Sequence, residues 1–298
     1  MIRRSIVLSA AAFLLLLACS EGTGPGGPPA IVFMSFGSTT SPYGRDPDIY
    51  VMDSLGRHVV NVTHRVGIDV DPAWSPDGAK IIFSRRDSTG AGHLFLMNPD
   101  GSDLTQLTFG TNSEWGPAWS PDGAKIAFIG SSRLYVMNAD GTGITPLLTD
   151  AFYDDRPSWS PDGRIVFLSN RGANGQSATH IYVINGDGTG LTVIGDTSAT
   201  EETPSWSADG RRIAFASNRE GGVFQIWLMN PDGSSPVRLT SDAGGNGEPS
   251  WSPDGSKIVF ASFRDHDVEI YVMHADGSQQ TRLTHMLGTY EHWPHWRP

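Results

Sequence analysis

Short apolar runs alternate with polar turns along most of the chain, and the alternation repeats at a regular spacing. In each repeat a proline stands two residues before a tryptophan, a Pro-Asp-Gly or Ala-Asp-Gly turn follows, and an apolar run comes next. Successive tryptophans are 40 to 47 residues apart. The full copies span 72–78, 117–123, 157–163, 204–210 and 249–255, and a truncated copy spans 294–298.

Each repeat predicts four strands. Proline sets φ in the turn, aspartate hydrogen-bonds its own turn backbone and glycine adopts the left-handed φ, so the tryptophan strand and the next apolar run form a hairpin. The second strand is apolar on both faces, as expected between packed neighbours. A third strand, such as 94–97, leads through an Asn-x-Asp-Gly hairpin to an outer strand such as 104–108. Four strands at this spacing indicate one propeller blade per repeat.

The two ends of the chain predict how the ring closes. Residues 30–35 form a second strand without a tryptophan strand, and residues 293–296 form a tryptophan strand without a successor. Pairing the two removes the exposed edges of an open array. The predicted fold class is therefore all-β, a six-bladed β-propeller closed by pairing of the C-terminal strand with the N-terminal three strands.

This connectivity predicts two different faces. One face, the hairpin face, carries the Pro-Asp-Gly and Asn-x-Asp-Gly hairpins. The other, the loop-rich face, carries the loops between second and third strands and the loops between blades, which vary in length, as in 36–47 and 170–179. Because loops on a rigid scaffold commonly bind ligands, the loop-rich face is the expected binding face.

The N-terminal segment predicts export and lipid attachment. Residues 1–18 contain Arg3, Arg4 and an apolar stretch too short for a typical membrane-spanning helix, which indicates a signal peptide. The tetrapeptide ending in Cys19 resembles the lipobox of bacterial lipoproteins, so Cys19 is the predicted lipid attachment site; soluble secretion is the alternative. The predicted division is a signal peptide at 1–18, a Gly/Pro-rich tether at 19–29 and a β-propeller at 30–298.

Composition narrows the partners. The 298 residues include one cysteine, which excludes an internal disulfide and a thiolate-rich metal site. The net charge of −11 disfavours nucleic acid and anionic lipid. We therefore expect a monomer that binds a protein or peptide of the cell envelope and contacts the membrane through its lipid anchor only.

Ser20 after the cysteine resembles the outer-membrane sorting signal of lipoproteins in enteric bacteria, which predicts a bacterial outer membrane location facing the periplasm.

Three residues before each repeat proline stands a polar side chain, expected to surround the channel mouth of a closed ring. Carboxylates there would attract a basic peptide or a cation such as Ca²⁺, although no cofactor is required by the sequence. The alternative is local ion pairing with arginines that follow the second strand, namely Arg86, Arg171, Arg219 and Arg264. The predicted channel-mouth positions are Asp69, Glu114, Asp154, Glu201 and Glu291, with Asn246 as the sixth.

The repeat Pro-x-Trp-Ser-Pro-Asp-Gly-x-x-Ile-x-Phe, followed by Ile-Tyr-Val-Met-Asn-x-Asp-Gly, resembles that of the TolB-like β-propellers over residues 30–298. The resemblance implies binding of protein segments at the channel face. It also implies an alternative, because some TolB-like propellers are metal-dependent lyases of sugar acids.

The lyase alternative would place a metal at His292 or His295 and act on an acidic saccharide, but the sequence offers these two residues only as weak metal candidates. Serine-hydrolase, Rossmann and P-loop motifs are absent. We therefore predict a non-enzymatic scaffold with no catalytic residues.

Overall fold

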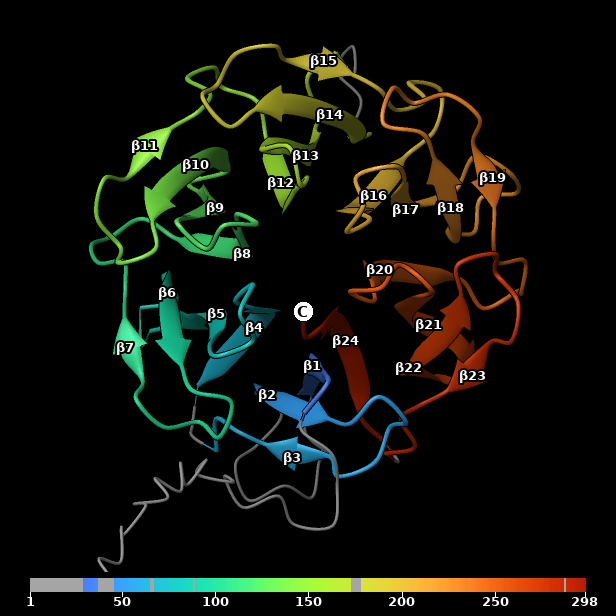
Figure 1. Cartoon of the computed structure of the whole chain (residues 1–298), viewed down its shortest axis with the longest axis horizontal. Helices are drawn as coiled ribbons and strands as arrows, with labels where there is room; N and C mark the ends of the chain where they lie inside the picture. The colour runs from blue at the N-terminus through green and yellow to red at the C-terminus, as the bar shows by residue number, and fades with distance from the viewer. Residues whose placement is uncertain (1–28, 37–45, 65–66, 88, 173–177, 287) are drawn as a thin grey trace, which may run out of the picture.

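The computed structural model describes residues 29–36, 46–64, 67–87, 89–172, 178–286 and 288–298. Within them, 24 strands form six four-stranded antiparallel sheets arranged as a ring (Figure 1). The predicted six-bladed β-propeller is therefore confirmed. No helix able to cross a membrane occurs among the described residues. The predicted signal peptide, Cys19 and residues 20–28 of the predicted tether lie outside them.

Five blades consist of four consecutive strands, with the first strand nearest the channel and the fourth at the rim (Figure 1). Their bounds are β4 (Ile68–Trp74), β5 (Ile81–Arg86), β6 (Gly92–Met97) and β7 (Thr105–Gln106); β8 (Glu114–Trp119), β9 (Lys125–Gly130), β10 (Arg133–Asn138) and β11 (Thr145–Pro146); β12 (Asp154–Trp159), β13 (Arg164–Ser169), β14 (His180–Asn185) and β15 (Thr192–Val193); β16 (Glu201–Trp206), β17 (Ile213–Ser217), β18 (Gln225–Met229) and β19 (Val237–Arg238); β20 (Asn246–Trp251), β21 (Lys257–Asp265), β22 (Asp267–His274) and β23 (Thr281–Arg282).

The sixth blade, here called the closure blade, joins the two ends of the chain. Its sheet order is β24 (Tyr290–Trp296), β1 (Ile31–Phe36), β2 (Pro47–Met52) and β3 (Val60–Asn61). Ile31 lies opposite Trp296, and Phe36 lies opposite Tyr290. The predicted closure is confirmed, and backbone hydrogen bonds join the first and last strands of the propeller within this blade.

The core lies between adjacent blades. Each second strand carries a phenylalanine that is at most 1% exposed, and the residue opposite it on the third strand is aromatic in every blade, as in the pairs Phe33–Tyr50 and Phe215–Trp227. The outer strands are shorter than predicted: β7 contains only Thr105 and Gln106 of the expected 104–108. An outer strand pairs on one edge only, so fewer contacts hold it in the sheet.

The inner strands β4, β8, β12, β16, β20 and β24 each contain a bulge one residue before the repeat proline. Register shifts occur there, as between Val70 and Ala73. Proline has no N–H to donate to the ladder, and a bulge removes it from regular pairing. The residue before proline adopts a left-handed φ of +50° to +59° in all six blades, at Asp71, Gly116, Arg156, Thr203, Glu248 and Trp293.

Deleting residues 293–298 tests the closure. The deletion removes most of β24, including Trp296, whose side chain is buried. Truncating one core aromatic costs about 3–5 kcal/mol, against a total stability of about 5–15 kcal/mol for a typical domain. We expect a lower Tm and rapid limited proteolysis. Val237→Ala, which shortens an exposed side chain of an outer strand, is the control and should leave both unchanged. Protease resistance equal to wild type in the deletion variant would contradict the closure role.

Candidate functional site

The polar residues three positions before the prolines lie at equivalent places, but inside the blade interfaces. All six are at most 7% exposed, and none lines the channel. Each contacts its own second strand or the blade before it. Binding of a partner or of Ca²⁺ by these side chains stays a prediction.

Local ion pairs hold three of them. Arg171 Nη2 lies 2.9 Å from Asp154 Oδ1, and Arg219 pairs with Glu201. Burial raises the pKa of both carboxyl groups, and the arginine charge opposes that shift. Asp69 pairs with Arg85 and not with Arg86, because Arg85 lies directly opposite Asp69 in the sheet.

Two of these carboxylates also satisfy backbone amides of the preceding blade. The amide of Leu134 donates to Asp154 Oδ2 at 3.3 Å, and that of Ile181 donates to Glu201 Oε2 at 3.2 Å. In the other four blades a threonine near the outer strand accepts the equivalent bond. Those threonines are Thr63, Thr108, Thr240 and Thr284. The carboxylates therefore join neighbouring blades where the threonine is missing.

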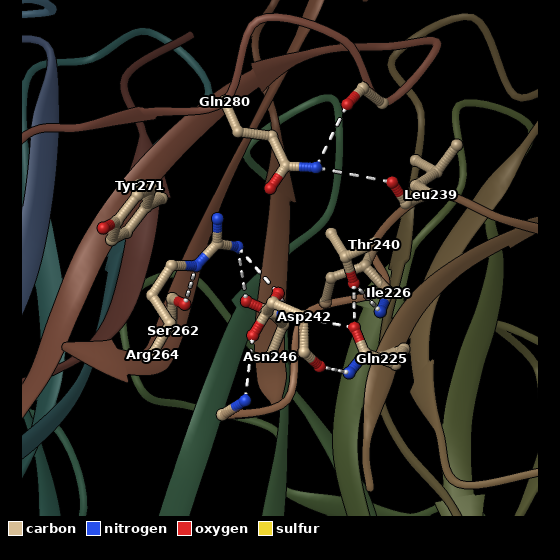
Figure 2. Close-up of polar contacts among 12 residues, drawn as sticks. Gln225, Ile226, Leu239, Thr240, Asp242, Asn246, Ser262, Arg264, Tyr271 and Gln280 are labelled. Atoms are coloured by element: carbon tan, nitrogen blue, oxygen red, sulfur yellow. Dashed lines mark hydrogen bonds and ion pairs between the residues drawn. The ribbon is translucent and has the colours of Figure 1, made fainter. Parts of the chain in front are cut away.

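Other polar contacts join the blades at two further interfaces. His93 Nδ1 lies 3.0 Å from Glu114 Oε2. Figure 2 shows Asn246 between two blades: its Nδ2 donates to Gln225 Oε1 at 2.9 Å, and its Oδ1 accepts from Arg264 Nη2 at 3.0 Å. Arg264 also pairs with Asp242 at 3.0 Å. The same position thus connects blades whether or not it is charged.

Glu291 is the exception, because it faces another carboxyl group. It accepts from Ser35 Oγ at 2.9 Å in the closure blade and lies beside Glu269 of β22. Glu269 pairs with Arg282 and accepts from Thr284 Oγ1 at 2.6 Å. Burial and the neighbouring Glu269 raise the pKa of Glu291 to about 7.

The channel itself is lined by the bulge residues, two positions beyond the predicted ring. Their side chains cap the amides of the next blade: Asp71 Oδ2 accepts from Gly116 N at 3.3 Å, Thr203 Oγ1 from Glu248 N at 3.1 Å, and Glu248 Oε2 from Trp293 N at 2.6 Å. Sequence reasoning missed this set. The invariable proline one residue later was the available signal, because it forces the bulge.

Arg156 closes the channel. Its guanidinium carbon lies 3.5 Å from the ring centre of Trp293, and its Nη1 donates to Asp71 Oδ1 at 2.6 Å. Strands β12 and β24, which carry Arg156 and Trp293, lie on opposite sides of the ring (Figure 1). Burial opposes the charge, but Asp71 and Asp155 outweigh it and raise the pKa of Arg156. A permanent cation therefore spans the channel.

On the hairpin side of this strut lies a cavity of about 500 Å³. Its walls are the repeat prolines and tryptophans together with prolines of the hairpins, such as Pro76 and Pro253, and its base contains Arg156 and Asp71. The chamber is therefore mostly apolar, and Asp71, Arg156 and Glu248 supply charge at its inner end.

On the loop-rich side the channel mouth is acidic and aromatic. Asp155 accepts from Trp115 Nε1 at 3.0 Å and from Tyr153 Oη at 2.7 Å. Glu202 is close by, and burial and the charge of Glu248 raise its pKa. Asp155 and Glu202 thus place carboxyl groups near Arg156, each one position beyond a predicted residue, Asp154 or Glu201.

His292 and His295 do not converge. His292 Nδ1 lies 2.9 Å from Glu248 Oε1; burial opposes protonation of His292, but Glu248 outweighs it and raises the pKa. His295 Nδ1 accepts from Trp74 N at 3.3 Å, and burial lowers its pKa to about 4. In the part of the chain that the structure describes, no group of three His, Cys, Asp or Glu side chains could hold a metal ion.

Comparison with known proteins agrees with this architecture. The family model for the TolB beta propeller domain matches residues 37–190 and 174–298. No curated protein matches the sequence. TolB from Acinetobacter baumannii superposes with a TM-score of 0.79 at 21% identity, covering 90% of this chain and 67% of that one.

Two further structures share the fold. A protein described as TolB from Agrobacterium tumefaciens has a TM-score of 0.68 at 22% identity, covering 91% of this chain and 100% of that one. An oligogalacturonate lyase in complex with manganese has a TM-score of 0.55 at 18% identity, covering 87% and 73%. At these identities the structural likeness shows the fold alone.

Glu291→Gln tests the buried carboxyl pair. An ordinary glutamate has a pKa near 4.3, so between about pH 4.5 and 7 the folded state keeps a proton that the unfolded chain has lost. Wild-type stability from this group therefore falls as pH rises through that window. We expect the variant to gain stability relative to wild type as pH rises from 5 to 8 in urea denaturation. Glu201→Gln is the contrast: it leaves Arg219 unpaired and should destabilise at pH 8. A difference in unfolding free energy between Glu291→Gln and wild type that stays constant over this pH range would contradict the raised pKa of Glu291.

Arg156→Gln tests the strut across the channel. It leaves the carboxylate of Asp71 buried without its cation, and we expect a loss of about 1–3 kcal/mol of unfolding free energy in urea denaturation. The double variant Arg156→Gln/Asp71→Asn removes both charges and should recover part of the loss. A double variant less stable than Arg156→Gln would show that the ion pair is not the source of the effect.

Proposed function

Because the chain belongs to the TolB β-propeller family, we propose that it is a non-enzymatic protein-binding scaffold of the bacterial cell envelope. In this proposal a lipid on Cys19 holds it at the membrane, at the outer membrane facing the periplasm. The loop-rich face and the channel mouth bind the partner.

The distribution of exposed aromatic side chains carries the proposal. Among the described residues, every strongly exposed aromatic lies at the loop-rich end of a strand or in a loop there. Exposed apolar residues of the hairpins and outer strands, such as Leu55, Ile144 and Val237, are aliphatic. Aromatic residues are enriched in protein interfaces and dominate their binding energy. The exposed aromatics are Phe36, Phe109, Phe152, Tyr153, Phe263 and Tyr290.

The channel mouth adds charge to this surface. Asp155, Glu202 and Glu248 lie near one another, and Arg156 with His292 supplies the opposing charge. Because Arg156 and Trp293 block the channel, a partner segment docks at the mouth and does not pass through. A segment that offers Lys or Arg side chains complements the acidic rim.

Photo-crosslinking tests the binding face. The three lysines, Lys80, Lys125 and Lys257, all lie beside Pro-Asp-Gly hairpins, so amine-reactive reagents would sample the hairpin face only. A photoreactive phenylalanine at Phe109 or Tyr290 samples the loop-rich face instead. In cells of the native source we expect one dominant protein adduct from each of these two positions.

The matched control places the same photoreactive residue at Leu55 and Ile144, which are exposed but distant from the loops. These positions should give no such adduct, and Phe263→Ala should reduce the adduct formed from Tyr290. Equal adducts from all four positions would contradict the proposed face. Turnover of an acidic oligosaccharide with added Mn²⁺, abolished by His292→Ala/His295→Ala, would instead favour the lyase alternative.

A further inference from the structure

The described chain enters the propeller at the hairpin face. Ala30 donates its amide to Met52 O at 2.8 Å, and Arg297 donates its own amide to Ala30 O at 2.7 Å. The Arg297 side chain holds Pro29 O at 3.4 Å and Gly78 O at 3.0 Å. Gly78 belongs to the first Pro-Asp-Gly hairpin, so Pro29 is fixed beside that hairpin.

The length of chain before Pro29 limits how far the fold can lie from an attached lipid. Ten residue steps separate Cys19 from Pro29. Fully extended, ten residues span at most about 35 Å. A strand of six residues is itself about 20 Å long, so the loop-rich face lies at least that much farther along the channel axis.

From this attachment point we propose that the hairpin face is turned toward the bilayer and the loop-rich face away from it. The proposal rests on the lipid anchor at Cys19 proposed above. It confines partner recognition to the loop-rich face, where the exposed aromatics lie. The cavity of about 500 Å³ opens toward the membrane and is out of reach of large partners.

The turn aspartates outnumber the lysines and arginines of the hairpin face, such as Lys80, Lys125 and Arg211, and this excess of negative charge opposes flat contact with anionic lipid. Ten turn aspartates accept a hydrogen bond from a serine or threonine hydroxyl of the same turn, and the pKa of each is lowered; at Asp162 the Arg164 side chain is the main cause. The negative charges of these aspartates repel anionic lipid headgroups. The length of the tether therefore sets the distance between the propeller and the bilayer, and adhesion of the hairpin face to lipid does not. These residues are Asp77, Asp100, Asp122, Asp140, Asp162, Asp187, Asp209, Asp232, Asp254 and Asp276.

Energy transfer to the bilayer tests the orientation in the full lipid-attached protein. Cys19 is the only cysteine, so an introduced cysteine is the only free thiol of the lipidated chain. Ala124 and Ala151 are exposed alanines flanking the same blade, at a hairpin and at an inter-blade loop. Each single variant, Ala124→Cys or Ala151→Cys, is labelled with a donor dye and reconstituted into phosphatidylcholine vesicles that contain an acceptor-labelled lipid.

We expect transfer from position 124 to be about twofold or more above transfer from position 151, given the ~20 Å that the strands impose. Inserting roughly 30 Gly and Ser residues between Gly27 and Pro28 should bring the two values together, because a long flexible tether no longer orients the ring. Equal or reversed transfer in the original tether overturns the orientation and leaves the anchor intact. Absence of the diacylglyceryl mass on the Cys19 peptide overturns both proposals.

Discussion

The prolines of the inner strands impose the constraint on which the channel depends. A proline cannot donate to the ladder, so each inner strand bulges one residue earlier and that residue takes a left-handed φ. The bulge turns a backbone amide and a side chain into the channel. Six repeats therefore place six such positions around one axis. The side chains at those positions decide whether the channel is open, polar or blocked. Here Arg156 and Trp293 contact each other across it.

The buried polar side chains three residues before each repeat proline serve a different purpose, because they join neighbouring blades. Packed strands leave third-strand amides that need an acceptor, and an unmet buried donor is costly. A threonine supplies the acceptor in four blades, and Asp154 or Glu201 of the next blade supplies it in the other two. An ionised carboxylate in that place needs a cation, which Arg171 and Arg219 provide. Burial, together with repulsion from Glu269, instead favours protonation of Glu291.

The two faces differ in what they can bind. The hairpin face is built from repeated turns whose aspartates are satisfied within each turn, so its chemistry varies little from blade to blade. The loop-rich face varies in length and carries the exposed aromatics, and the acidic mouth of the closed channel lies among them. Membership of the TolB propeller family supports a binding role, and the difference between the faces is the basis for proposing the loop-rich face as the binding surface.

The sequence by itself determined the blade number, the strand order within each blade, the closure and the identity of the two faces. These follow from local turn chemistry and from a repeat that admits one way of burying strands that are apolar on both sides. It also indicated an acidic channel mouth. Only the tertiary structure decided which residues form it. A bulge changes by one position which side chains of a strand point toward the channel, and the spacing of residues in the sequence does not show that change. Likewise, the register of β5 places Arg85, and not Arg86, opposite Asp69. Arg156 contacts Trp293 of the opposite blade, which lies 137 positions away in a chain of 298 residues. Such contacts depend on closing the ring, which brings distant repeats together around the axis.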